Sequence, residues 1–158
     1  MKNYQTGQIR NLGVVAHGGA GKTSLVEALL FNTGVLSRIG RIEDGTTTSD
    51  YHPEETSRQI TVHTSLVPCE VNGVKVNLLD TPGFSDFIGE VKGALRVSDS
   101  AMFVVSAVDG VEVQHEVIWD LADEANLPRI VFINKMDREN ADFKKVLDDL
   151  KTKFKANF

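Results

Sequence analysis

The sequence predicts a three-layer α/β fold in which a mostly parallel sheet carries one antiparallel edge strand. Short apolar runs of strand length alternate with apolar stripes of helical period along the chain. Asn72-Gly73 separates two of the strand-like runs and is the strongest short-range signal for a β-hairpin. The 158 residues are 41% hydrophobic and 25% charged, as in a globular protein with a buried core. We therefore expect one domain over residues 1–158.

The first predicted strand covers residues 9–16, a mostly apolar, β-branched run that suits a strand buried on both faces. A Gly-rich loop follows, and the helix after it is expected to stop near Gly34. Residues 35–60 show little periodicity and many Gly, Thr, Ser, Asp and Glu residues. A loop of that length within a compact domain is usually functional or mobile.

The predicted hairpin pairs residues 62–71 with residues 74–80, and Pro68 makes the first of these an edge strand. The rest of the chain alternates helical stripes with strand-like runs, in the order 87–95, 101–108, 113–125, 129–133 and 143–154. Such alternation predicts parallel strands joined by right-handed crossovers, with helices on both faces of the sheet.

Composition excludes several classes of protein. The single Cys69 cannot form an internal disulfide, which favours a reducing compartment, and we expect a cytoplasmic protein. The polar N-terminus has no signal-peptide pattern, and no apolar run approaches the ~18 residues of a membrane span. The net charge of −5 argues against DNA as a partner. An RNA partner would have to bind a local patch.

Three polar clusters, at residues 16–23, 80–83 and 134–137, each follow a predicted strand. In open α/β sheets ligands bind beyond the carboxyl ends of the strands, so the clusters together predict one site. The first cluster reads Ala16-His17-Gly18-Gly19-Ala20-Gly21-Lys22-Thr23, with Ser24 next. It matches the phosphate-binding loop of nucleotide-binding proteins, with Ala in place of the first Gly.

The residue types of this loop suit phosphate binding. Small residues let backbone N–H groups turn inward toward phosphate oxygens at a helix N-terminus. Lys22 would reach the β- and γ-phosphates, and the Thr23 hydroxyl would bind Mg²⁺. The alternative, a plain Gly-rich turn, is disfavoured by the strand and helix on either side.

The second cluster, Asp80-Thr81-Pro82-Gly83, follows the second strand of the hairpin. Asp80 is expected to hold Mg²⁺ through water, and the Gly83 N–H to contact the γ-phosphate. Thr61, at the end of the long polar loop, could close on Mg²⁺ and the γ-phosphate in the triphosphate state and be disordered otherwise. The alternative for Thr61 is an ordinary surface residue before a strand.

The third cluster, Asn134-Lys135-Met136-Asp137, predicts the choice of base. A carboxylate at Asp137 can accept two hydrogen bonds from the N1–H and N2–H₂ edge of guanine, which adenine cannot offer. The alternative is that Asp137 caps the helix that follows. An adenine-nucleotide kinase or ATPase is disfavoured by Asn134 and Asp137.

With these motifs in place, the chain resembles the N-terminal part of the GTP-binding domain of a translational GTPase, elongation factor G or a divergent paralogue. The resemblance covers the segments 16–23, 34–45, 58–61, 80–83, 106–113 and 129–138. It implies a P-loop NTPase fold of the GTPase type, here without its last strand and helix. It also implies GTP or GDP and Mg²⁺ as cofactors, with Lys22, Thr61 and Gly83 in catalytic roles. The expected partners are the ribosome and the remaining domains of a longer protein.

The chain departs from the family pattern at four positions. Phe84 stands where the family has a His thought to orient the attacking water, and Gln59 stands where it has Gly. Gly18 and Gly19 replace Ile or Val followed by Asp. Because a phenyl ring cannot position water, the alternative is a GTP-binding conformational switch with little intrinsic hydrolysis.

Overall fold

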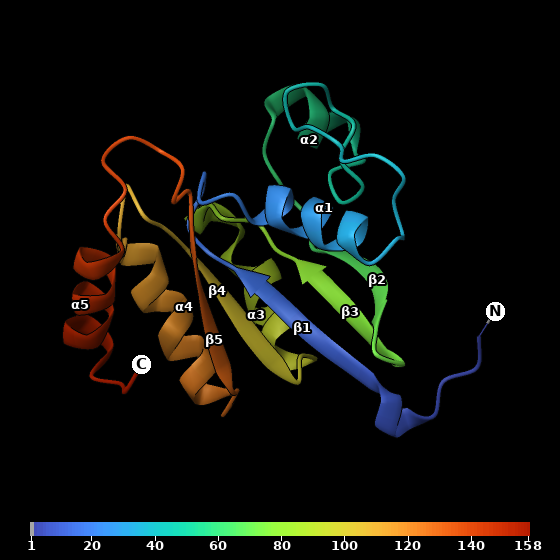
Figure 1. Cartoon of the computed structure of the whole chain (residues 1–158). Helices are drawn as coiled ribbons and strands as arrows, with labels where there is room; N and C mark the ends of the chain where they lie inside the picture. Colours follow the sequence, from blue (N-terminus) through green and yellow to red (C-terminus); the bar gives the residue numbers. More distant parts are fainter. Residues whose placement is uncertain (1) are drawn as a thin grey trace.

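A five-stranded sheet forms the centre of the computed structural model, which describes residues 2–158 (Figure 1). The strands are β1 (Ile9–Val15), β2 (Ser65–Val71), β3 (Val74–Asp80), β4 (Ser100–Ser106) and β5 (Arg129–Asn134). Their spatial order is β2-β3-β1-β4-β5. β1 pairs in parallel with β3 and β4, β4 pairs in parallel with β5, and β2 runs antiparallel to β3. The predicted fold class is confirmed.

The β2–β3 hairpin forms at the predicted turn. Asn72 and Gly73 have φ values of 50° and 79°, and Val71 pairs with Val74 across the turn. Positive φ at both central residues gives the tight turn whose twist matches that of the strands. β2 lies at the edge of the sheet, where the missing N–H of Pro68 does least harm.

Helices cover both faces of the sheet, as predicted. α1 (Lys22–Asn32) packs Val26 and Leu30 against Val14 and Val104 of the strands. The opposite face is covered by α3 (Ile88–Arg96), α4 (Val113–Glu124) and α5 (Phe143–Phe154). Short 3₁₀ turns occupy Thr6–Gln8 and Ser85–Phe87. Among residues 2–158, no helix is long and apolar enough to cross a membrane.

The prediction of an irregular segment over residues 35–60 is wrong for residues 53–58, which form the helix α2 (Pro53–Arg58). Pro53 opens this helix, two glutamates occupy its first turn, and Gln59 ends it with φ 56°. Six residues are too few for apolar periodicity to reveal a helix. The side chain of Glu55 from α2 is fully buried, so this face of α2 is covered by neighbouring residues.

Part of the face that α1 covers is open to solvent at β5. Ile130 and Phe132 lie in register with Met102 and Val104 of β4, on the side of the sheet where α1 packs. Their side chains are 56% and 40% exposed. No helix among residues 2–158 covers this face of the sheet at its β5 edge, which agrees with the prediction of a fold without its last strand and helix.

Candidate nucleotide-binding site

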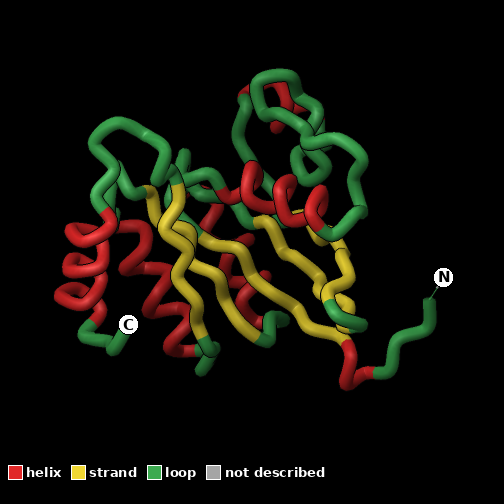
Figure 2. Tube along the Cα trace, in the orientation of Figure 1, coloured by secondary structure: helices red, strands yellow, loops and turns green. Residues whose placement is uncertain are grey.

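The loops after β1, β3 and β5 gather at one end of the sheet, as Figure 2 shows. β1 is the central strand, and the chain continues to β3 on one side of it and to β4 on the other. Ligands of open α/β sheets bind at such a switch point. A hollow of about 360 Å³ lies there, lined by Gly18, Gly19, Gly21, Lys22, Thr23, Ser24, Ile42, Glu43, Asp50, Gln59, Ile60, Thr61, Gly83, Phe84 and Lys135.

Residues 16–23, named the phosphate loop after their predicted role, turn into the start of α1 because Gly19 and Gly21 adopt left-handed backbone conformations. Gly19 and Gly21 have φ values of 79° and 93°, which side chains rarely tolerate. A Cβ on Gly21 would also lie 2.5 Å from Nδ2 of Asn134. The loop therefore needs glycine at Gly21 both for its turn and for the close approach of β5.

Lys22 is 5% exposed, and its Nζ donates a hydrogen bond to the carbonyl oxygen of His17, 3.3 Å away. Burial lowers the pKa of Lys22, and the carboxyl groups of Asp80 and Asp50 act in the opposite direction. Its only hydrogen-bond acceptor among residues 2–158 is thus a carbonyl of the loop itself. An anion in the hollow could accept a hydrogen bond from this ammonium group directly.

Asp80 is the centre of a buried cluster of hydroxyl groups. Its Oδ2 accepts hydrogen bonds from Thr23 Oγ1 at 2.9 Å and from Ser49 Oγ at 2.7 Å. Thr61 Oγ1 lies 3.2 Å from Thr23 Oγ1. Burial raises the pKa of Asp80 to about 6, and Lys22 opposes that rise. The three residues predicted to surround a metal ion, Thr23, Thr61 and Asp80, are therefore brought together.

The donor set fits Mg²⁺. Oδ1 of Asp80 and Oδ1 of Asp50 are buried and have no hydrogen-bond partner among residues 2–158. Hydroxyl and carboxylate oxygens are the ligands that this cation takes, and it usually keeps waters and phosphate oxygens as well. In the described part of the chain no three His, Cys, Asp or Glu residues form a metal-binding group, so protein carboxylates alone would not hold the ion.

Asp50 and Ser49 are site residues that the sequence analysis missed. Both are buried, and Asp50 lines the hollow. Burial raises the pKa of Asp50. They belong to the long segment between α1 and β2, whose many Ser, Thr and Asp residues give no spacing that singles out these two.

Gly83 and Phe84 follow β3 and pack against the phosphate loop. A Cβ on Gly83 would lie 2.6 Å from Nζ of Lys22 and 2.8 Å from the backbone N of Gly18. Phe84 lies over Gly18, where an added Cβ would be 2.9 Å from Cζ of the ring. The phenyl group therefore occupies the space that a side chain at Gly18 would take.

Other predicted residues support the site from outside the hollow. Thr81 is fully buried and binds the carbonyl oxygen of Val14 through both its N–H and its hydroxyl, which ties the end of β3 to β1. His17 stacks edge-on against His115 at 5.3 Å between ring centroids, and burial lowers its pKa. The remaining predicted residues that do not line the hollow are Ala16, Ala20, Asp80, Pro82, Asn134, Met136 and Asp137.

The cluster after β5 joins the phosphate loop through Asn134, whose Nδ2 donates to the carbonyl oxygen of Ala20 at 2.9 Å. Lys135 has a φ of 61° and lines the hollow. Asp137 is exposed. The interpretation of Asp137 as a helix cap is wrong, because α5 begins at Phe143 and its N-cap is Asp142. The carboxyl group of Asp137 is thus free of that structural role.

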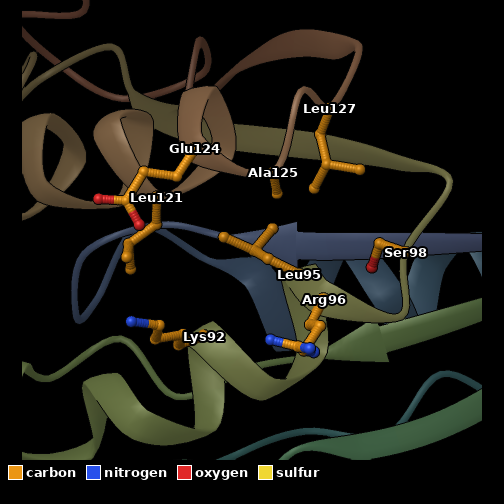
Figure 3. Close-up of a pocket in the computed structure, with 8 residues that line it drawn as sticks. All are labelled: Lys92, Leu95, Arg96, Ser98, Leu121, Glu124, Ala125 and Leu127. Atoms are coloured by element: carbon orange, nitrogen blue, oxygen red, sulfur yellow. The ribbon is translucent and has the colours of Figure 1, made fainter.

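A second hollow, of about 450 Å³, lies between α3 and α4 (Figure 3). It includes Ser98 and Leu127, which precede β4 and β5, so it is at the opposite end of these strands from the phosphate loop. None of the residues predicted for the site line it. Its size alone therefore gives no reason to move the candidate site.

The chain is similar to known GTP-binding domains. A family model described as the elongation factor Tu GTP binding domain matches residues 7–158. An elongation factor G from Granulibacter bethesdensis is 48% identical over 146 residues, which are 92% of this chain and 21% of that protein. One from Thermotoga neapolitana is 46% identical over 150 residues, 95% of this chain and 22% of that protein.

A solved structure of a Thermus thermophilus protein, described as ttk003000868, aligns with a TM-score of 0.89 and 45% sequence identity. The alignment covers 93% of this chain and 22% of that one. The chain therefore spans about a fifth of the length of the relatives it matches.

Proposed function

The chain belongs to the family of the elongation factor Tu GTP-binding domain and is similar to elongation factor G; on that premise we propose that its hollow binds GTP or GDP with Mg²⁺ and hydrolyses GTP. One observation carries the proposal. The loops after β1 and β3 and the segment before β2 meet in one hollow, with the buried ammonium group of Lys22 among them. A buried cation beside a Gly-rich helix N-terminus is suited to the phosphates of a nucleotide.

Different residues of the hollow would bind the phosphates and the Mg²⁺ ion. Backbone N–H groups from residues 18–23 would contact the phosphates, and Lys22 would pair with the β- and γ-phosphates. Thr23 and Thr61 would hold Mg²⁺ directly and Asp80 would hold it through water, with Asp50 nearby. The bound ion would neutralise charge on the phosphate oxygens. Lys22, Thr61 and the N–H of Gly83 are the groups proposed to act on the γ-phosphate.

Guanine is the proposed base. Asp137 caps no helix and is exposed at the same end of the sheet, where its carboxylate can accept from the N1–H and N2–H₂ groups of guanine. Asn134 would fix the position of this cluster by its bond to the phosphate loop. Adenine offers no such donor pair, so discrimination of about 10⁴ is attainable from this contact type.

A second candidate, a GTP-binding switch with little intrinsic hydrolysis, is favoured by Phe84. The ring lies on Gly18, lines the hollow and has no atom that can accept a hydrogen bond from water. Positioning of the attacking water is a large part of catalysis in this class of reaction. We therefore propose slow intrinsic hydrolysis, with rapid turnover dependent on a partner.

The relatives named elongation factor G support a role in translation. We propose that the protein acts with the ribosome in translocation or recycling, through further domains of a longer protein, in the cytoplasm. Neither a membrane nor DNA is proposed as a partner. The relatives are about five times longer than the matched segment, so this role rests on their similarity rather than on the residues of the hollow.

Calorimetric titration with GTP, GDP and ATP, with and without Mg²⁺, tests the binding proposal. Guanine nucleotides should bind, Mg²⁺ should strengthen GTP binding, and ATP should compete poorly. Single-turnover phosphate release, with and without ribosomes, then separates the two candidates. Fast release without ribosomes would contradict slow intrinsic hydrolysis, and equal affinities for GTP and ATP would contradict the base assignment.

A further inference from the structure

Glu27, on the second turn of α1, is fully buried and takes part in no ion pair within residues 2–158. Its two carboxyl oxygens instead accept hydrogen bonds from two backbone N–H groups of the segment between α1 and α2. Oε2 accepts from Gly40 at 2.8 Å, and Oε1 accepts from Thr48 at 2.6 Å. Burial of a charge-bearing side chain is costly unless such partners are provided. The helix that begins at the phosphate loop is thus fastened to the long segment at two points.

The fit at Gly40 leaves no room for a side chain. A Cβ there would collide with the carbonyl oxygen of Thr46 and would lie 2.8 Å from Oε2 of Glu27. Glycine is needed at this position for close approach. The contact between α1 and the segment is therefore tightly packed as well as hydrogen-bonded.

The second of these bonds is next to the site. Thr48 precedes Ser49, whose hydroxyl donates to Asp80, and Asp50, which lines the hollow. Glu27 itself is one helical turn beyond Thr23. Holding the N–H of Thr48 therefore fixes where the next two residues stand relative to the proposed Mg²⁺ site.

A different glutamate holds the other end of the same segment. Glu55 of α2 accepts from the N–H groups of Val62 and His63, each at 3.0 Å, and so fixes the backbone directly after Thr61. Because Glu55 belongs to the segment itself, its bonds keep α2 and Thr61 together but do not attach them to the rest of the domain. Near Ser49 and Asp50 the segment is attached to β3 by the bond from the Ser49 hydroxyl to Asp80, and to β2 by Ser65 Oγ, which donates to the Ser49 carbonyl oxygen at 2.6 Å. Its attachment to α1 comes from Glu27.

We propose that Glu27 is a positioning residue for the triphosphate form of the site, which holds residues 40–50 against α1 so that Ser49 and Asp50 face Asp80 and Lys22. This inference rests on the proposed function. Two acceptor oxygens are required because both partners are N–H donors. A glutamine has one acceptor oxygen and an amide that would face a second donor, so it keeps the volume and loses one bond.

The test is Glu27→Gln, with Glu124→Gln as the matched control on an exposed position of α4 far from the segment. Site-resolved amide exchange by NMR should become at least about tenfold faster in Glu27→Gln at Gly40 or at Thr48, whichever N–H loses its acceptor oxygen. Amides at Val62 and His63 should keep their exchange rates, since Glu55 holds them. Thermal unfolding and exchange in β1 and β4 show that the variant is folded.

Gly40→Ala gives the same test from the other side of the contact and should produce the same exchange pattern. In both variants, affinity for a non-hydrolysable GTP analogue with Mg²⁺ should fall about tenfold, while GDP affinity changes less than about twofold. Unchanged exchange at Gly40 and Thr48 would overturn the proposal. Faster exchange with unchanged analogue affinity would reduce Glu27 to a structural role and would also overturn it. If the wild-type protein binds no guanine nucleotide, the proposed function fails, and the exchange data alone decide whether Glu27 holds the segment.

Discussion

His115 makes the stability of the domain depend on pH. Its side chain is fully buried at the start of α4, where Nδ1 accepts from the N–H of Glu112 at 3.0 Å. Nε2 lies 3.1 Å from the carbonyl oxygen of Val104 in β4, and donates to it in the neutral ring. Both nitrogens are used by a neutral imidazole, so a second proton would break the bond to Glu112.

Burial lowers the pKa of His115 from 6.5 to about 4, and the charges of His17 and Lys22 add to this effect. Because the folded pKa is depressed, the unfolded chain takes up a proton first as the pH falls. The contribution of neutral His115 to the free energy of unfolding is therefore fully present above about pH 6.5 and is lost between about pH 6.5 and pH 4. A difference of about 2.5 pKa units corresponds to a full loss of about 3 kcal/mol, of which about 2 kcal/mol falls between pH 7.5 and pH 5.

Urea unfolding of the wild-type protein and of His115→Gln, at about pH 7.5 and pH 5, measures the pH-dependent contribution of His115 to the free energy of unfolding. At pH 7.5 the free energy of unfolding should be lower for the variant than for the wild type. Between pH 7.5 and pH 5 the variant should lose about 2 kcal/mol less of this free energy than the wild type loses. His63→Gln, at an exposed position, is the control for removal of a histidine. If the wild type and His115→Gln lose the same free energy between the two pH values, the assignment of a buried neutral His115 is refuted.

Three further predictions concern the site and its cover. Phe84→His in the full-length protein should raise single-turnover phosphate release at least about tenfold, and an unchanged rate would remove the water-positioning argument. Gly18→Ala should displace the Phe84 ring, seen as shifted aromatic NMR signals. Because that ring is 45% exposed, the free energy of unfolding should change by less than about 1 kcal/mol, with Gly89→Ala as control; signals that stay in place would contradict the contact. Appending the next strand and helix of an elongation factor G relative should cover Ile130 and Phe132 and strengthen GDP binding about 10- to 100-fold, whereas equal affinities would count against that reasoning.

Local sequence pattern predicts those features that repeat or that need a special backbone. Runs such as residues 9–16 and the helical stripes indicated the strands and most helices, because burial on one or two faces leaves a period in the sequence. Asn72-Gly73 indicated the hairpin because both residues must adopt positive φ. The glycines at residues 19 and 21 indicated the turn between β1 and α1 for the same reason, since both adopt positive φ.

Features that depend on contacts between distant segments leave no such signal. α2 has six residues and no period, so it stays hidden in a polar stretch. Ser49 and Asp50 gain their place only when the segment folds back onto Asp80. Glu27 gives a weak sequence signal, because it is a charged residue next to Val26 in an apolar helix. Its partners Gly40 and Thr48 are 13 and 21 residues away along the chain, so the sequence does not indicate them. Burial and pairing at that range follow from the packed structure.

The central claim is that this site binds a guanine nucleotide through Asp137, and Asp137→Asn tests it most directly. Affinities for GDP and XDP, measured by calorimetry on the wild-type and variant proteins with Mg²⁺, are the readout. The wild type should bind GDP and reject XDP. The variant should lose GDP affinity and gain XDP affinity, because the new amide can donate to the C2 carbonyl of xanthine. The same preference for GDP in both proteins would contradict the account.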